Sequence, residues 1–114
     1  MKDIKYYSKD LLQLKPDVKG AKMWAVALEK TMLTYFEIES DSKFDMHSHE
    51  NEQITMVLEG ELFFLINDEE ICVKAGEVLA VPSNLYHGVY TKNKFVKAID
   101  ARSPIRKEYK NSDI

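Results

Sequence analysis

Short stretches of hydrophobic and β-favouring residues alternate with turn residues along most of the chain. Eight such stretches can be recognised, at residues 23–28, 32–39, 53–58, 61–66, 70–74, 77–81, 85–91 and 95–101. Residues typical of tight turns separate them, among them Glu59-Gly60, Asn67-Asp68 and Ala75-Gly76. No connection has room for the crossover helix of a parallel βαβ unit. The pattern predicts an all-β fold, either a small antiparallel barrel or a jelly roll.

The segments outside these stretches are more polar. In residues 8–19 we expect an arm with one short turn or edge segment ahead of the first long strand. The charged residues after Arg106 predict a tail that frays beyond Tyr109. A chain of 114 residues accommodates one compact domain but not two. We therefore expect an N-terminal arm at 1–21, one barrel at 22–109 and a C-terminal tail at 110–114.

Several of the expected strands are hydrophobic on both faces. Residues 54–58 and 62–66 leave few positions that suit contact with water. In a small barrel one face of a strand fills the interior, and the other must be covered by a second layer or by another subunit. We expect a homodimer, and a thick two-layer monomer is the alternative.

Charge and cysteine content narrow the partners and the cellular location. Sixteen basic and nineteen acidic residues, mixed along the chain, give a formal net charge of −3, and no basic block is available to follow a phosphate backbone. Cys72 is the only cysteine, which excludes an internal disulfide and is typical of a reducing cytosol. The first residues lack the apolar run of a signal peptide, and no stretch is long enough for a membrane helix. We expect a cytoplasmic protein without nucleic-acid or membrane partners.

The three histidines of the chain fall in two short segments. On an extended strand, side chains two residues apart point to the same face, so His47 and His49 can present two imidazoles to one point. Gln53 has the same parity, and His87 shares the face of apolar neighbours that should point inward. A single histidine on an apolar face is more often a core residue with one hydrogen bond, but three imidazoles in one cavity are good metal ligands. The pattern predicts a metal site formed by His47, His49 and His87, with Gln53 as a fourth candidate ligand.

A carboxylate and two arginines near the C-terminus form a second candidate group. Alternation along residues 96–102 places Asp100 and Arg102 on the face of two apolar residues that should point inward. A buried carboxylate needs a partner, and either a metal site or an arginine would supply one. In one interpretation Asp100 is a general acid or base beside a bound substrate. In the other it forms a structural ion pair with Arg102 or Arg106.

Taken together, these motifs resemble the cupin family. The first cupin motif has two histidines separated by one residue, then usually a glutamate and later a glycine; its places are held here by His47, His49, Gln53 and Gly60. The second motif is matched by Gly76, Pro82 and His87, with Asn84 at its second glycine and Thr91 at its closing asparagine. The resemblance covers residues 22–109. It implies a single cupin β-barrel, also called a double-stranded β-helix or jelly roll, with one bound divalent metal ion.

Gln53 departs from the usual cupin motif. Glutamate would bring a negative charge to the metal, whereas glutamine offers a neutral amide oxygen. With three neutral imidazoles the ion would keep its full charge and Lewis acidity, which favours polarising a carbonyl or hydroxyl group of an anionic substrate. Oxygen activation more commonly uses two histidines and one carboxylate. Imidazole-rich sites accept zinc, nickel, iron, manganese or copper, so the metal identity stays open.

The C-terminal residues resemble the closing motif of one cupin subgroup. Asp100, Ser103-Pro104, Arg106 and Tyr109 match the pectin-degradation type, which converts 4,5-unsaturated monouronates to linear ketonised sugars and also has glutamine at the position of Gln53. The resemblance implies that Asp100 acts in proton transfer and that Arg106 binds the substrate carboxylate. Arg102 stands where the subgroup usually has phenylalanine, and it is a further candidate for binding the carboxylate.

Three functions therefore follow from the sequence. The first is a metal-dependent enzyme that carries out proton transfer or tautomerisation on a small anionic sugar. The second is a cupin-type metal dioxygenase, for which three histidines could also serve. The third is a sugar-binding or sensor cupin without catalytic activity.

Overall fold

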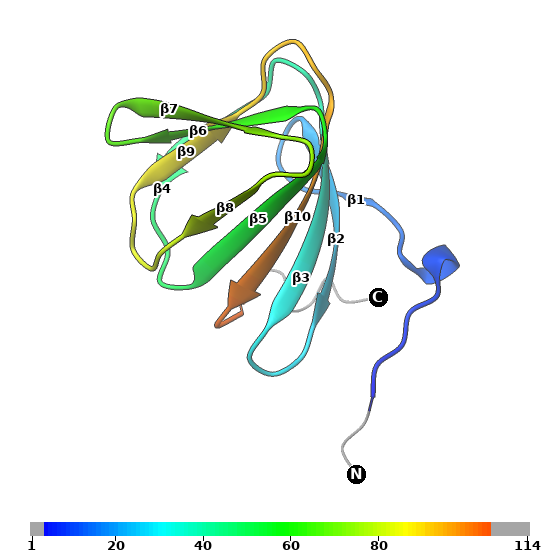
Figure 1. Ribbon diagram of the computed structural model, residues 1–114. Helices are drawn as coiled ribbons and strands as arrows, with labels where there is room; N and C mark the ends of the chain where they lie inside the picture. Colours follow the sequence, from blue (N-terminus) through cyan, green and yellow to red (C-terminus); the bar gives the residue numbers. More distant parts are fainter. Residues whose placement is uncertain (1–3, 106–114) are drawn as a thin grey trace.

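Two antiparallel β-sheets that face each other form the body of the chain (Figure 1). The computed structural model describes residues 4–105. The six-stranded sheet has the order β1-β2-β3-β10-β5-β8, and the four-stranded sheet has the order β4-β9-β6-β7. This arrangement confirms the predicted all-β fold, a single barrel of the jelly-roll type.

The strands are β1 (Lys15–Pro16), β2 (Ala21–Ala27), β3 (Met32–Ile38), β4 (Lys43–His47), β5 (Glu52–Glu59), β6 (Glu61–Ile66), β7 (Glu69–Lys74), β8 (Val78–Val81), β9 (His87–Tyr90) and β10 (Val96–Ser103). A 3₁₀ helix, η1 (Lys9–Leu11), precedes them. Within residues 4–105, no helix has both the length and the apolar character needed to cross a membrane.

Each of the eight predicted stretches corresponds to a strand whose ends differ from the prediction by at most two residues. The strand β4 was not among them, because it is short and carries only two apolar side chains, Phe44 and Met46. In the segment predicted as an arm, β1 pairs with β2 at the edge of the larger sheet. The tail predicted at 110–114 lies outside the described residues.

Turn residues with positive φ connect the strands. Asn67 and Asp68, at φ 50° and 65°, close the hairpin between β6 and β7. Gly60, at φ 82°, joins β5 to β6, and a Cβ atom at this position would collide with the backbone carbonyl of Phe95. Asn84 has φ 65°, the left-handed conformation expected at this position of the motif.

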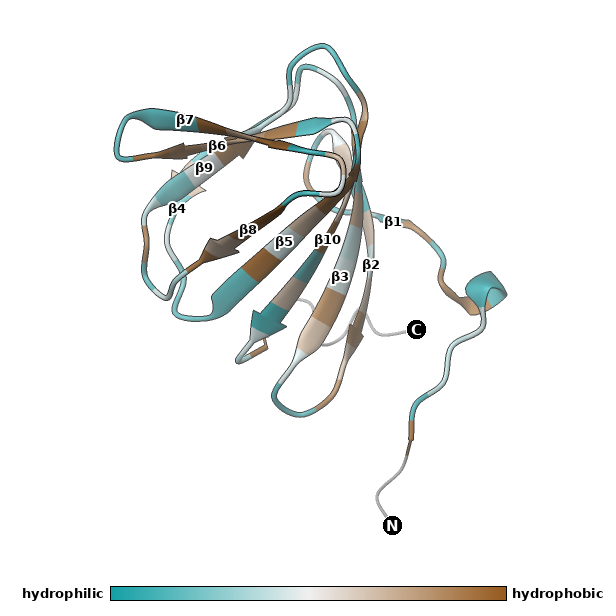
Figure 2. Cartoon of the chain, viewed as in Figure 1, coloured by the Kyte–Doolittle hydropathy of each residue, from teal (hydrophilic) through white to brown (hydrophobic). Residues whose placement is uncertain are grey.

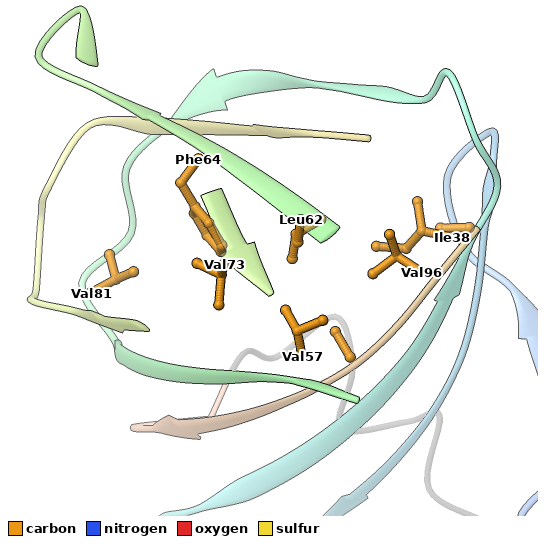
Figure 3. Close-up of a cluster of buried hydrophobic side chains, with 9 residues drawn as sticks. Ile38, Val57, Leu62, Phe64, Val73, Val81 and Val96 are labelled. Atoms are coloured by element: carbon orange, nitrogen blue, oxygen red, sulfur yellow. The ribbon is translucent and has the colours of Figure 1, made fainter. Parts of the chain in front are cut away.

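The hydrophobic core lies between the two sheets (Figure 3). Alternation along β5 buries Gln53, Thr55 and Val57 and leaves the residues between them exposed, so one face of this strand points into the barrel. Leu62 and Phe64 of β6 meet this face from the opposite sheet and are almost fully buried. The same two side chains also line the cavity that His47 and His87 line, so the core supports the site directly.

Truncating the core at Leu62 tests this description of the barrel. We expect Leu62→Ala to lower the free energy of unfolding by about 2–5 kcal/mol, because it removes buried methyl groups and leaves a void. Leu62 is 3% exposed, whereas Leu28 is 57% exposed, so Leu28→Ala is the matched control and should change stability by no more than about 0.5 kcal/mol. Urea unfolding, followed by Trp24 fluorescence, measures the free energy of unfolding of both variants. Equal losses of stability in the two variants would contradict the assigned core.

Candidate metal centre

A cavity of about 410 Å³ lies between the sheets and is lined by residues from both. Its volume is within the range of roughly 300–1,000 Å³ that is typical of small-molecule sites. Much of the wall is apolar. The polar side chains that line it are Asp17, Lys43, Asp45, His47, Gln53, His87, Asp100 and Arg102. A small polar molecule would therefore meet charged and metal-ligating groups inside an otherwise apolar chamber.

The three histidines converge at one end of the four-stranded sheet. His47 is the last residue of β4 and His87 the first of β9, and the two are register partners across this strand pair. His49 follows two residues after the end of β4. The ring centroids are 4.6–5.3 Å apart, and one ligating atom from each ring lies within 4.8 Å of the others. The structure thus brings together the three imidazoles that the sequence singled out.

An extra residue in β4 directs His47 into the cavity. The register changes from Phe44 opposite Val89 to His47 opposite His87, which is three steps on β4 against two on β9. Without this bulge Phe44 and His47 would point to opposite faces, because side chains alternate along a strand. Both side chains line the cavity. The bulge is therefore what combines a hydrophobic wall residue and a candidate metal ligand on one face.

Two hydrogen bonds tie the loop of His49 to the loop that precedes His87. The Asn84 N–H donates to the His49 carbonyl at 2.8 Å, and the Ser83 hydroxyl donates to the Glu50 carbonyl at 2.6 Å. Strand alternation predicts His49 on an extended strand, but β4 ends at His47. The direction of the His49 ring is therefore set by these loop contacts and not by strand alternation.

Each histidine ring is held by a backbone carbonyl two residues away. The Nδ1 atoms of His47, His49 and His87 lie 3.0, 2.9 and 2.9 Å from the carbonyl oxygens of Asp45, Asn51 and Leu85. A carbonyl can only accept a hydrogen bond, so Nδ1 carries the proton in each ring. In a neutral imidazole the lone pair then resides on Nε2, which is the form that binds a metal ion.

Burial also favours the neutral form of His87. Loss of hydration lowers the pKa of this imidazole, and the neighbouring His47, His49 and Arg102 lower it further by charge repulsion. The hydrogen bond to the Leu85 carbonyl opposes this shift. A lowered pKa keeps the imidazole unprotonated near neutral pH, so a metal ion would not have to displace a proton from it.

Four polar side chains on the six-stranded sheet line up in a buried hydrogen-bonded chain. Gln53 Nε2 donates to Thr55 Oγ1 at 2.8 Å, and Thr55 Oγ1 donates to Asp100 Oδ1 at 2.7 Å. Arg102 Nη2 donates to Asp100 Oδ2 at 3.0 Å and forms a buried ion pair with it. Among the described residues, buried Gln53 Oε1 has no hydrogen-bond partner. An amide oxygen left in this state suits a metal ion or a substrate hydroxyl.

The residues named from the sequence are therefore placed as follows. His47, His49 and His87 form one cluster, and His47 and His87 line the cavity, whereas His49 does not. The buried side chains of Gln53, Asp100 and Arg102 line the same cavity. Arg106 lies outside the described residues. The donor set fits a divalent ion, because three neutral nitrogens and an amide oxygen are suitable ligands for zinc, nickel, iron or manganese.

Sequence reasoning missed Thr55, Lys43 and Asp45. Thr55 could have been found, since it lies two residues after Gln53 and shares its parity. Its link to Asp100 joins residues 45 positions apart and depends on the strand register. Lys43 and Asp45 line the cavity on β4, where the bulge disturbs alternation, so no sequence signal would have identified both.

A family model and several solved structures are similar to this chain. A family model described as "Cupin domain" matches residues 34–99. In solved structures, a RmlC-like cupin from Shewanella frigidimarina NCIMB 400 has a TM-score of 0.85 at 19% identity, covering 94% of this chain and 96% of that one. KdgF from Halomonas sp. has a TM-score of 0.84 at 19% identity, covering 93% and 98%. At these identities the structural likeness shows the fold alone.

The curated relatives that match this chain in sequence are acireductone dioxygenases. The acireductone dioxygenase of Leishmania major is 29% identical over 105 residues, which are 87% of this chain and 27% of that protein. The acireductone dioxygenase of Yarrowia lipolytica is 29% identical over 91 residues, 75% of this chain and 46% of the relative. The chain thus spans about a quarter to a half of the length of these relatives.

Removing one imidazole tests the metal centre. We expect His49→Ala to weaken binding of Zn²⁺ or Ni²⁺ by about 100-fold or more, because even outer groups that only orient ligands contribute 10- to 100-fold. Ser48→Ala, at the exposed residue between the two histidines, should leave affinity unchanged. Isothermal titration calorimetry measures the metal affinity of both variants. Wild-type affinity in the His49 variant would exclude this site.

Proposed function

This chain belongs to the cupin family, and on that premise we propose that it is a metal-dependent enzyme acting on a small anionic sugar. The proposed reaction is the ring-opening tautomerisation of a 4,5-unsaturated uronate. One observation carries the proposal: the buried Asp100–Arg102 pair and the imidazoles of His47 and His87 line a single cavity. The single cysteine, Cys72, supports the further proposal that this enzyme works in the cytoplasm.

The proposed metal ligands are His47, His49, His87 and Gln53. Their donor atoms are three imidazole nitrogens and the Gln53 amide oxygen, all of them uncharged. A bound zinc, nickel, iron or manganese ion would supply Lewis acidity toward the substrate oxygens, undiminished by a carboxylate ligand. The carbonyl contacts of the three rings hold the ligating nitrogens in place before any ion binds.

Asp100 is the proposed proton carrier. In a 4,5-unsaturated uronate the ring oxygen links the hemiacetal carbon C1 to C5 of the double bond. Asp100 takes the proton of the C1 hydroxyl, the bond from C1 to the ring oxygen breaks, and the electron pair remains on that oxygen as an enolate. Delivery of the proton to C4 then gives a linear product with an aldehyde at C1 and a ketone at C5. The carboxylate is regenerated, so the reaction is an isomerisation.

Arg102 is the proposed partner of the substrate carboxylate. It lines the cavity, and its guanidinium already pairs with Asp100 at 3.0 Å. A guanidinium presents several N–H groups in a planar fork and can pair with more than one carboxylate. A substrate acid bound there would lie next to the proton carrier. The role of Arg106 in the same task rests on the motif resemblance alone.

Replacing the proposed proton carrier should abolish most of the turnover. With metal-loaded protein and unsaturated uronates, we expect Asp100→Asn to lower kcat on the order of 100-fold or more, since a positioned acid or base contributes about 10²–10⁴. Loss of the absorbance of the conjugated double bond follows the reaction. The control is Asp68→Asn in the exposed β6–β7 turn, where asparagine tolerates the positive φ. Equal rates in both variants would contradict the role of Asp100.

A metal dioxygenase is the second candidate function. The curated relatives favour it, since acireductone dioxygenases match 75–87% of this chain at 29% identity in two organisms. The three histidines could serve this chemistry as well, although a carboxylate ligand is the commoner arrangement. Oxygen consumption with an acireductone substrate distinguishes the two functions. Uptake of oxygen, together with no turnover of uronates, would replace the sugar-acid proposal by the dioxygenase.

The outer face of the six-stranded sheet supports the proposed homodimer. Strand register aligns two apolar rows across five strands: Val26, Leu33, Ala101, Ile54 and Ala80, and Trp24, Tyr35, Ile99, Met56 and Val78. Figure 2 shows the hydrophobic character of β8, the outermost of these strands. A third row alternates in charge, with Lys22, Glu37, Lys97 and Glu59. A second copy offers the same apolar rows and both signs of charge, so the face is complementary to itself.

A charge placed in these rows should separate the subunits. We expect wild-type protein to have twice the chain mass in light scattering, and Ile54→Lys to have the mass of one chain, because burying an unpaired ammonium is unfavourable. Leu28→Lys is the control, since Leu28 is similarly exposed and lies outside both rows. A wild-type mass of one chain at micromolar concentration would contradict the homodimer.

A further inference from the structure

Thr55 occupies a position from which it can control the proposed metal ligand Gln53. It lies two residues along β5 on the same inward face and is 1% exposed. We infer that Thr55 is a positioning residue: its hydroxyl fixes the orientation of the Gln53 amide, so that the amide oxygen and not the NH₂ group is available in the cavity. This inference rests on the proposed function, in which Gln53 contributes to the metal centre.

The number of protons that each group can share sets the direction of these hydrogen bonds. A threonine hydroxyl has one proton to donate, and Thr55 Oγ1 donates it to Asp100 Oδ1 at 2.7 Å. A carboxylate can only accept, so this direction follows from the chemistry of Asp100. The Thr55 oxygen is therefore left as an acceptor toward Gln53. Only the NH₂ end of the amide can satisfy it, as the 2.8 Å contact from Gln53 Nε2 shows.

Arg102 keeps the chain of hydrogen bonds running in this direction. Its Nη2 donates to the second oxygen of Asp100 at 3.0 Å, and both side chains are more than nine-tenths buried. The two Asp100 oxygens thus accept hydrogen bonds from Arg102 and Thr55, and an ionised carboxylate offers no donor to the Thr55 hydroxyl. One hydrogen-bonded relay therefore joins Arg102, Asp100, Thr55 and Gln53. In it, Asp100 accepts from both Arg102 and Thr55, and Thr55 accepts from Gln53. The relay ends at Gln53 Oε1, which is buried and has no hydrogen-bond partner among the described residues.

The relay matters because the two ends of a glutamine amide have nearly the same shape. Rotation by half a turn exchanges an oxygen, which has lone pairs, for an NH₂ group, which has only donors. The NH₂ group cannot act as a metal ligand. Without the Thr55 hydroxyl, the buried Nε2 atom would lose its acceptor, and the preference for the productive orientation would disappear. Thr55 would thus affect a bound ion through Gln53 and not by binding it.

Cobalt binding by hydroxyl-deleting and hydroxyl-retaining variants tests the inference. We expect Thr55→Val to weaken Co²⁺ binding by about 10- to 100-fold, the effect of removing a group that orients a ligand. The visible absorption bands of the bound cobalt should also change, because one oxygen ligand is lost. Thr55→Ser retains the hydroxyl and should restore both affinity and spectrum. If Thr55→Val does not fold, Thr55→Ala replaces it in the comparison with Thr55→Ser.

Thr34 provides a matched control for the loss of a buried hydroxyl. It is fully buried on β3 and is the register partner of Asp100 on the side away from Thr55. Its Oγ1 has no hydrogen-bond partner among residues 4–105. Thr34→Val should therefore leave cobalt affinity and spectrum unchanged. An equal loss of affinity in the Thr34 and Thr55 variants would show a general packing effect and would overturn the inference.

A double-mutant cycle tests whether Thr55 acts through Gln53. In the Gln53→Ala background, Thr55→Val should cause no further loss of cobalt affinity; an undiminished additional loss would overturn the inference. Wild-type affinity and spectrum in Thr55→Val would overturn it as well, while the metal centre itself would stand. If the wild-type protein binds no cobalt, the metal centre of the proposed function fails, and the role of Thr55 fails with it.

Discussion

The hydrogen bonds between three histidine Nδ1 atoms and backbone carbonyls are the constraint on which the proposed site depends. Each contact spans two residues and measures 2.9–3.0 Å, so the backbone itself sets the tautomer and the direction of every ring. The β4 bulge and the ties between the His49 and His87 loops place these carbonyls correctly. The convergence of the three imidazoles is therefore a consequence of local backbone geometry at one end of the four-stranded sheet.

The two sheets contribute different residues to the proposed site. The four-stranded sheet and its loops carry the imidazoles, and the six-stranded sheet carries the relay from Arg102 through Asp100 and Thr55 to Gln53. Buried charge is tolerated in the relay because the carboxylate and the guanidinium neutralise each other. Core side chains such as Leu62 and Phe64 also form part of the cavity wall, which couples the stability of the barrel to the shape of the site.

Much of this arrangement could be predicted from the sequence where simple alternation holds. Along β10 the period of two residues correctly indicates that Asp100 and Arg102 point inward. Alternation fails at β4, because an inserted residue reverses the parity between Phe44 and His47. It also cannot describe His49, which is oriented by a loop. The relay through Thr55 required the register between β5 and β10, which no local pattern contains.

The central claim is that three neutral imidazoles, each protonated on Nδ1, present Nε2 to one metal ion. Long-range ¹H–¹⁵N correlation spectra of the histidine rings test it directly, since the chain has only three histidines. The account predicts the Nδ1–H tautomer for all three rings and a shift of all three Nε2 resonances when Zn²⁺ is added. Rings with the proton on Nε2, or Nε2 resonances that do not respond to zinc, would contradict it.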